Sequence, residues 1–259
     1  MQVILDVQNL TKTFTLSKKQ QKLEKTDIKK RIAVNDLSFQ AYAGEIYGLL
    51  GPNGAGKTTT LRILATLIKQ DAGDALVSGF SVKKDPDKVR SKIGFLTSEQ
   101  KLDDFFTPNY LFDYFGRLHG LTEERLVLRK KELFSKFGVT EFAEVKVANL
   151  SSGMKQKTSL VISIIHDPDI IIFDEPTNGL DVLTAQTVID FLLELRAAGK
   201  TIILSTHIFS LVERICDRVG VIIDGRMVFE EKMATFSVPN SLEERFFLEY
   251  KKLHGGIDA

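Results

Sequence analysis

The sequence predicts an α/β fold in which a mainly parallel β-sheet carries an antiparallel β edge and an inserted α-helical subdomain. Three observations support this prediction. From residue 170 onwards, short apolar runs alternate with helical patterns, which is typical of parallel strands covered by helices on both faces. The dipeptide Asp224-Gly225 joins two short apolar runs and is typical of a type I′ hairpin, which adds antiparallel strands. The middle of the chain, about residues 99–165, has helical patterns and is therefore expected to be an insertion.

The composition excludes several classes of protein. Of the 259 residues, 43% are hydrophobic and 27% are charged, a balance that excludes wholesale disorder. The net charge is +1, so there is no general basic field, and nucleic acid is not expected as a partner. The single cysteine, Cys216, excludes an intramolecular disulfide and a cysteine-rich zinc site. No apolar run approaches the roughly 20 residues of a membrane helix. The N-terminus also lacks the pattern of a signal peptide. We therefore expect a cytosolic chain that reaches a membrane only through a partner.

The N-terminal part has two apolar patterns separated by a basic segment. Residues 3–7 alternate apolar and polar side chains, as a strand does, and residues 32–39 form the second apolar pattern. The segment 17–31 between them holds seven basic and two acidic residues, a local charge of +5. It is either the solvated tip of a hairpin or a surface that contacts anionic lipid headgroups, and the sequence does not decide between the two.

The remaining elements follow from apolar periodicity and from capping residues. Thr107, Thr122 and Ser151 are suited to cap three helices of the middle segment, and Gly120 and Gly138 to end the first two. The expected order is a strand over 45–50, a helix over 58–67, helices over 107–119, 122–138 and 151–165, a strand over 170–173, a helix over 183–198, a strand over 201–205, a helix over 209–216, strands over 219–223 and 226–229, and an amphipathic helix over 241–253.

A glycine-rich segment follows the strand expected over 45–50. It reads Gly51-Pro52-Asn53-Gly54-Ala55-Gly56-Lys57-Thr58 and fits the Walker A pattern G-x-x-x-x-G-K-[ST] between a strand and a helix. Glycines let the backbone wrap a phosphate, and the amides of residues 54–59, which include Thr59, then point at it with the helix dipole. Lys57 is expected to reach the β- and γ-phosphates of ATP, and the Thr58 hydroxyl to bind Mg²⁺. A purely structural turn has no need of Lys57 or Thr58, so the sequence predicts a P-loop NTPase (RecA-like) fold.

Two carboxylates lie at the end of the apolar run over 170–173. In a doubly wound sheet the carboxyl ends of the strands are where ligands bind. Asp174 is expected to hold Mg²⁺ through its water shell, and Glu175 to orient and polarise the attacking water. The alternative is a buried strand that simply runs into an acidic loop.

The segment Leu150-Ser151-Ser152-Gly153-Met154 resembles the LSGGQ signature of ABC-type ATPases, with Ser152 and Met154 at variant positions. By itself Ser-Ser-Gly before a helix is only an N-cap. Here it comes shortly before Asp174 and Glu175, which resemble the Walker B pair of that family. With the motifs below, the resemblance covers nearly the whole chain.

The resemblance implies roles for further residues. Phe14 resembles the aromatic that stacks on adenine, although it could instead be a core or edge aromatic. Asp181, in Asn178-Gly179-Leu180-Asp181, resembles the D-loop that touches the partner subunit. His207 resembles the switch histidine that contacts the γ-phosphate. The chain departs from the family at position 98, where a glutamine is expected but Ser98, Glu99 and Gln100 occur in turn. Either Ser98 acts through a bridging water or one of the next two residues replaces the glutamine.

The resemblance also implies partners. Two chains, identical or paralogous, are expected to pair head to tail, so that each ATP lies between the phosphate loop of one and Ser151–Gly153 of the other. The core would comprise residues 1–98 and 166–237, the helical signature subdomain residues 99–165, and a C-terminal helical tail residues 238–259. The helical subdomain, rich in aromatics between residues 105 and 115, would meet a polytopic membrane permease at the cytoplasmic face of the membrane.

Three classes of ABC-type ATPase compete, and the transporter class is favoured. A single Walker A motif argues against the ribosome class, and the short stretch between Lys57 and Asp174 leaves no room for the long coiled coils of the DNA class. The tail Ser241-Leu-Glu-Glu-Arg-Phe246 resembles the ending of an exporter (ABC-2-like) branch. The segments 33–39, 61–66 and 93–97 are most similar to those of sodium-extruding (Nat-type) ATP-binding subunits. Because cargo is chosen by the membrane subunit, drug, antibiotic or lipid-linked cargo stays open beside sodium, and a soluble ATPase acting on ribosomes or DNA stays the alternative.

Overall fold

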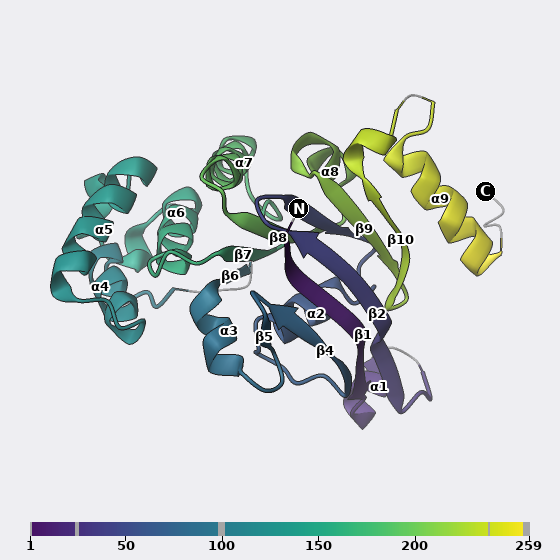
Figure 1. The fold of residues 1–259 in the computed structure, drawn as a ribbon. Coiled ribbons are helices and arrows are strands. Elements are labelled where there is room, and N and C mark those ends of the chain that lie inside the picture. Colours follow the sequence, from purple (N-terminus) through teal and green to yellow (C-terminus); the bar gives the residue numbers. More distant parts are fainter. Residues whose placement is uncertain (1, 24–25, 98–101, 238, 256–259) are drawn as a thin grey trace.

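The computed structural model describes residues 2–23, 26–97, 102–237 and 239–255, and it contains two β-sheets in the predicted α/β arrangement (Figure 1). The smaller sheet is antiparallel and has the order β2-β1-β4-β5. The larger sheet has the order β10-β9-β3-β8-β7-β6, in which all neighbours are parallel except β9 and β10. The strands are β1 (Val3–Thr15), β2 (Lys30–Tyr42), β3 (Ile46–Leu50), β4 (Ala72–Val77), β5 (Phe80–Ser81), β6 (Ile93–Thr97), β7 (Ile170–Asp174), β8 (Thr201–Thr206), β9 (Arg218–Ile223) and β10 (Arg226–Lys232).

The larger sheet is buried on both faces, which explains the continuous apolar runs in its sequence. On β7, Ile171 and Phe173 pack into one core with the helices, whereas Ile170 and Ile172 pack into the other core with the antiparallel sheet. Helix α2 contacts β7 and β8 from the second face, and α7 and α8 cover the first (Figure 1). The predicted mainly parallel sheet with an antiparallel edge is confirmed.

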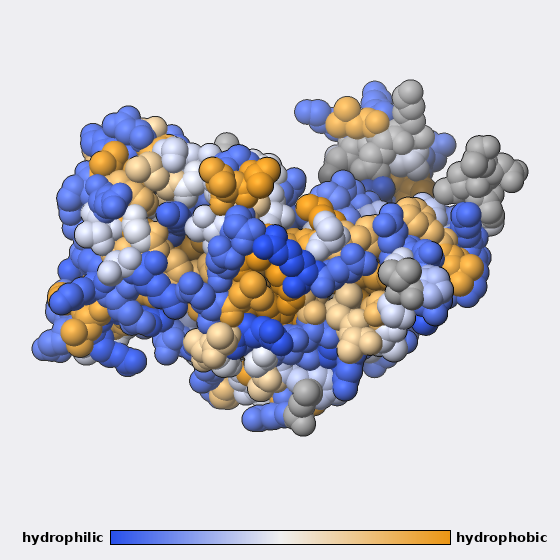
Figure 2. Space-filling model, turned by 90° about the horizontal axis from the view of Figure 1, so that it is seen from above, coloured by the Kyte–Doolittle hydropathy of each residue, from blue (hydrophilic) through white to orange (hydrophobic). Residues whose placement is uncertain are grey.

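The helices are grouped by the surface that they cover. Three of them, α4 (Pro108–Leu118), α5 (Glu123–Phe137) and α6 (Ser152–Ser163), lie together as an arm at one end of the molecule (Figure 1). The others are α1 (Lys18–Leu23), α2 (Lys57–Leu64), α3 (Pro86–Lys92), α7 (Val182–Ala197), α8 (Phe209–Ile215) and α9 (Leu242–His254). Within the described ranges, no helix combines the length and the apolar character needed to cross a membrane. Figure 2 shows the face toward α7, α8 and α9, where apolar side chains form several separate groups among hydrophilic ones.

The predicted capping residues set the limits of the arm helices. Thr107 and Thr122 accept hydrogen bonds from the backbone amides of Tyr110 and Arg125, and Gly138 ends α5 with φ +63°. The hairpin between β9 and β10 also has the predicted type I′ character, because Asp224 and Gly225 have φ of +49° and +77°.

Five α-helices and β-strands were not predicted. The basic segment between β1 and β2 contains the short helix α1, and β4, β5 and α3 occupy a stretch in which no pattern was identified. Strand β6 follows them in a segment to which no strand was assigned. Strand β4 begins Ala-Gly-Asp, which are poor strand formers, and it exists because it pairs with β1. Strands β1 and β2 are also longer than predicted, since they extend together to Thr15 and Lys30.

Candidate functional site

Three neighbouring strands of the larger sheet end beside one another, and each carries part of the candidate site. Strand β3 leads into the phosphate loop over 51–58, β7 ends at Asp174, and β8 lies between them and leads to His207. Because the strands are parallel, their carboxyl ends meet at one edge of the sheet. The Thr58 hydroxyl donates to Asp174 Oδ1 over 3.0 Å, which joins the start of α2 to the end of β7.

The phosphate loop requires glycine at two positions because the backbone of other segments lies against it. A Cβ at Gly51 would lie 2.2 Å from the carbonyl oxygen of Ile222, and a Cβ at Gly56 would lie 2.2 Å from that of Ala33. Gly56 also has φ +102°, outside the range that L side chains adopt. Among the other residues of the loop, Asn53 and Gly54 are exposed, and Thr59 is half-buried on the first turn of α2.

The hairpin turn between β9 and β10 braces this loop. The Gly225 amide donates to the carbonyl oxygen of Ala55 over 3.0 Å, and the Gly225 carbonyl accepts from the amide of Asn35 over 2.8 Å. The Gly51 amide, at the start of the loop, donates to the carbonyl of Thr206 over 3.3 Å. The loop is therefore held at its start by the end of β8 and in its interior by the hairpin turn, which is itself bonded to β2 of the smaller sheet.

Lys57 is buried within the loop. Its ammonium group donates to the carbonyl oxygens of Gly51 at 2.7 Å and Pro52 at 3.1 Å, and it lies 3.7 Å from Glu175 Oε1. Burial lowers the pKa of this ammonium group from its ordinary value, and the nearby carboxylates of Glu175 and Asp174 oppose that change. The arrangement holds the positively charged Lys57 ammonium group under the loop, where it can contact phosphate oxygens.

Glu175 lies between Lys57 and His207. Its carboxylate is 3.7 Å from Lys57 Nζ and 3.1–3.2 Å from His207 Nδ1. Its backbone has φ +52°, which is uncommon for a residue with a side chain and is found where surrounding structure enforces it. His207 is exposed, so its ring can meet both Glu175 and a group bound on the loop. The structure thus brings together Lys57, Glu175 and His207.

The oxygen atoms near Thr58 suit a small, hard cation. Thr58 Oγ1 and Asp174 Oδ1 are within hydrogen-bond distance, and Mg²⁺ in proteins takes one or two such ligands with water and substrate phosphates completing its shell. In the described ranges there is no cluster of three or more His, Cys, Asp or Glu side chains that could hold a metal alone. The donors therefore fit Mg²⁺ that arrives with a phosphate ligand.

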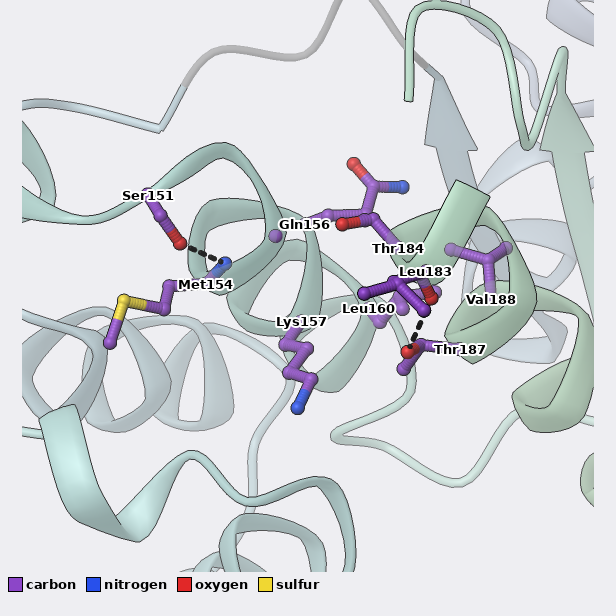
Figure 3. Close-up of a pocket in the computed structure, with 10 residues that line it drawn as sticks. Ser151, Met154, Gln156, Lys157, Leu160, Leu183, Thr184, Thr187 and Val188 are labelled. Atoms are coloured by element: carbon purple, nitrogen blue, oxygen red, sulfur yellow. Dashed lines mark hydrogen bonds between the residues drawn. The ribbon is translucent and has the colours of Figure 1, made fainter. Parts of the chain in front are cut away.

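Ser151, Ser152 and Gly153 lie at a different place, at the N-terminus of α6. Ser151 Oγ accepts from the Met154 amide, and both residues line a pocket of about 240 Å³ between α6 and the start of α7 (Figure 3). Asp181 caps α7 by accepting from the amides of Leu183 and Thr184 over 3.0 Å. In the part of the chain that the structure describes, no hydrogen bond or ion pair joins Ser151, Ser152 or Gly153 to the phosphate loop. One chain therefore does not bring the signature segment and the loop together.

Phe14 lies near the end of β1, in the antiparallel sheet. Its ring is 39% exposed, and Lys12 Nζ is 5.6 Å from the ring centroid. The exposed ring is suited to stacking, but its role toward adenine stays a prediction. Ser98, Glu99 and Gln100 lie outside the described residues.

Ser205 belongs to this site and was not identified from the sequence. It is fully buried, and its hydroxyl donates to Asp174 Oδ1 and accepts from the Glu175 amide. In the sequence it is one polar residue at the end of an apolar run, and only the pairing of β7 with β8 sets it opposite Asp174.

Comparisons with known proteins agree with this geometry. The family model that matches the chain is that of the ABC transporter, and it covers residues 34–178, more than half of the chain. The ABC transporter ATP-binding protein NatA of Bacillus subtilis is 38% identical over 87% of this chain and 92% of that protein. The Nod factor export ATP-binding protein I of Burkholderia lata is 40% identical over 77% of this chain and 66% of that protein.

Solved structures resemble the whole fold. An ATP-binding subunit of an ABC transporter superimposes with a TM-score of 0.80 at 26% identity, covering 96% of this chain and all of that one. The ATP-binding cassette MJ0796, solved as a dimer in a post-hydrolysis state bound to ADP and Pi, gives a TM-score of 0.76 at 25% identity, covering 88% of this chain and 98% of that one.

Proposed function

Because this chain belongs to the ABC transporter family as an ATP-binding, ATP-hydrolysing subunit, we propose that it powers export through a separately encoded membrane subunit. The observation that carries the ATPase part of this proposal is the convergence of Lys57, Thr58, Asp174 and Glu175 where β3 and β7 end. That convergence gives one chain the groups needed to bind a nucleoside triphosphate and to activate water beside it.

The chemistry assigned to these residues is positioning and charge stabilisation. The loop amides and Lys57 hold the β- and γ-phosphates, and Thr58 and Asp174 would hold Mg²⁺, which neutralises phosphate charge when bound. Glu175 orients a water molecule for attack on the γ-phosphorus. As the new P–O bond forms, the bond to the β-phosphate oxygen breaks, and ADP and inorganic phosphate result. His207, in contact with Glu175, is assigned to the γ-phosphate as the group that senses its loss.

We also propose that two chains close head to tail around ATP. The separation of Ser151 from the phosphate loop within one chain supports this, because the helix N-terminus of α6 then has a phosphate partner only in a second chain. Beside it, Val182 and Leu183 are 84% and 81% exposed next to Asp181, as expected of residues that a second subunit covers. The related MJ0796 cassette was solved as a dimer. Loss of the γ-phosphate would remove contacts across that interface and let the subunits part.

The permease is proposed to contact the helical arm. Phe105, Tyr110, Tyr114 and Leu118 are exposed there, while the neighbouring Phe112 is fully buried in the core of the arm. Exposed aromatic groups beside a packed core are typical of a surface that a partner covers. We accordingly propose a peripheral position at the cytoplasmic face of the membrane. We also propose the division into a core (1–98 and 166–237), a helical subdomain (99–165) and a tail (238–259).

Sodium ions are the proposed cargo, on the strength of the sequence resemblance to Nat-type subunits. Another relative is named a Nod factor export ATP-binding protein, which supports outward transport. The soluble alternative, an ATPase acting on ribosomes or DNA, is not favoured, because the matching relatives are named as ATP-binding proteins of transporters or of export and resistance systems.

The test is the variant Glu175→Gln, tagged and incubated with ATP and Mg²⁺ in native membranes. We expect ATP binding to be kept, turnover to fall at least 100-fold as for other groups that act in the transition state, and a dimer to co-purify with a polytopic membrane protein. The matched control is Glu213→Gln on the exposed side of α8, which removes a carboxylate away from the site. Normal hydrolysis by Glu175→Gln would contradict the assigned role. Ribosomes or DNA-associated proteins in place of a membrane protein would support the soluble alternative.

A further inference from the structure

The end of β8 places one hydroxyl group between the two carboxylate residues of the site. In the parallel pairing of β7 and β8, Ser205 is the direct partner of Asp174. Its Oγ donates to Asp174 Oδ1 over 2.5 Å, and it accepts from the backbone amide of Glu175 over 3.3 Å. A hydroxyl has one proton to donate and lone pairs to accept with, so both bonds can form at once.

The two hydrogen bonds stabilise a buried carboxylate, that of Asp174, and an uncommon backbone conformation, that of Glu175. Asp174 is buried, and a buried carboxylate keeps its orientation and charge only if hydrogen bonds satisfy it. Glu175 has φ +52°, and its amide is directed at Ser205, whose carbonyl oxygen also accepts from it over 3.1 Å. Ser205 therefore contacts the residue that turns the backbone away from the strand as well as the carboxylate that precedes it.

The other donor to Asp174 Oδ1 cannot replace Ser205. That donor is Thr58, whose hydroxyl oxygen is proposed to bind the cation itself. The buried Thr60 hydroxyl has its proton in use, because it donates to the Gly56 carbonyl. Thr206 Oγ1 contacts a different group, the Ile208 amide, from which it accepts. Ser205 is thus a donor to Asp174 that is not itself proposed to bind the cation.

We propose that Ser205 is a positioning residue for hydrolysis: its hydroxyl fixes the Asp174 carboxylate in the orientation that receives Mg²⁺ and, through the Glu175 amide, holds the carboxylate that orients water. The inference rests on the proposed function of the site. It assigns a shared task to the end of β8 and the residue that follows it, because Ser205 contacts both carboxylate residues and His207 contacts Glu175 directly.

The experiment measures ATP binding by calorimetry as a function of Mg²⁺ concentration, beside steady-state hydrolysis, on the full chain. For Ser205→Ala we expect the apparent Mg²⁺ affinity in the presence of ATP to fall about tenfold or more, as is typical when a residue that orients a metal ligand is removed. The kcat should fall by a similar factor, and the KM for ATP at saturating Mg²⁺ should change by less than about twofold, because ATP contacts are intact.

Two further variants separate this role from a loss of stability. Thr201→Val removes another buried hydroxyl from the same strand, one that accepts from the Gly44 amide at the far end of β8. It should lower thermal stability and leave the Mg²⁺ titration as in the wild type. Ser205→Cys keeps the shape and weakens the donor, so it should give a smaller shift in Mg²⁺ affinity than Ser205→Ala and serves if the alanine variant does not fold.

The outcomes are distinguishable. A Mg²⁺ titration of Ser205→Ala or Ser205→Cys that superimposes on that of the wild type would overturn the inference and leave the proposed function standing. Wild-type chain that binds ATP equally with and without Mg²⁺ would overturn the metal role of Asp174, and the inference with it.

Discussion

Replacing Gly56 by alanine tests whether contacts from a distant strand dictate the shape of the phosphate loop. The new Cβ would lie 2.2 Å from the Ala33 carbonyl oxygen, which is backbone and cannot rotate away, and φ at Gly56 is +102°. Gly44 offers a matched control, since it has φ +80° with nothing within 4 Å of its added Cβ. Gly44→Ala should cost only the conformational strain, about 1–2 kcal/mol of unfolding free energy. Gly56→Ala should cost that and about 1–3 kcal/mol more for overpacking.

The measurement is urea unfolding of the two variants and the wild type, with the free energies compared at equal slope. We expect Gly56→Ala to be the less stable variant by at least about 1 kcal/mol, and to bind ATP weakly in calorimetry, whereas Gly44→Ala should bind as the wild type does. If the two variants lose the same free energy, the loop is free to move away from Ala33 and the reasoning from the close contact is refuted.

Three further predictions concern other parts of the chain. Burial lowers the pKa of His166, and charge repulsion from the stacked His119 ring is the second cause. Together they bring the pKa to about 4, below the value of 6.5 in the unfolded chain. The unfolded chain therefore binds the extra proton between these values, and stability should fall by up to about 3 kcal/mol as the pH drops from 6.5 to 4. His166→Gln should flatten that part of the profile in pH-dependent thermal melts, and an unchanged slope would assign the acid sensitivity to other groups. Ser151→Ala should lower hydrolysis more than it lowers ATP binding by the single chain, as calorimetry beside an ATPase assay would show. Equal losses of hydrolysis and of ATP binding would contradict the proposal that Ser151 acts on ATP held by a second chain. Ser241 and Glu244 form a capping box on α9, so Ser241→Ala should cost about 1 kcal/mol in urea unfolding, and no loss would show that packing alone sets this helix.

The elements that the sequence predicted are those whose signals are local. The arm helices have threonine or serine caps, and a glycine follows α4 and α5. The buried strands of the larger sheet have continuous apolar runs, so each of these elements could be predicted without knowledge of its neighbours. Strand β4 differs, because its partner β1 lies far away in the sequence and its own residues disfavour a strand. Helix α3 has seven residues, too few for its apolar periodicity to be distinct.

The candidate site was predictable to the extent that motifs mark it. The Walker segments predicted that Lys57, Thr58, Asp174 and Glu175 lie close together, and the structure places them together. Their chemical roles stay predictions. Ser205 was not identified, because its contacts depend on the register of β7 against β8, which no local pattern encodes.

The brace that Gly225 provides to Ala55 has a consequence for how the chain matures. The hairpin amide that binds the interior of the loop is synthesised 170 residues after it (225 minus 55). A nascent chain that stops before β9 has the complete Walker A motif without that support. Nucleotide capture is therefore expected to begin only once the hairpin of β9 and β10 has left the ribosome.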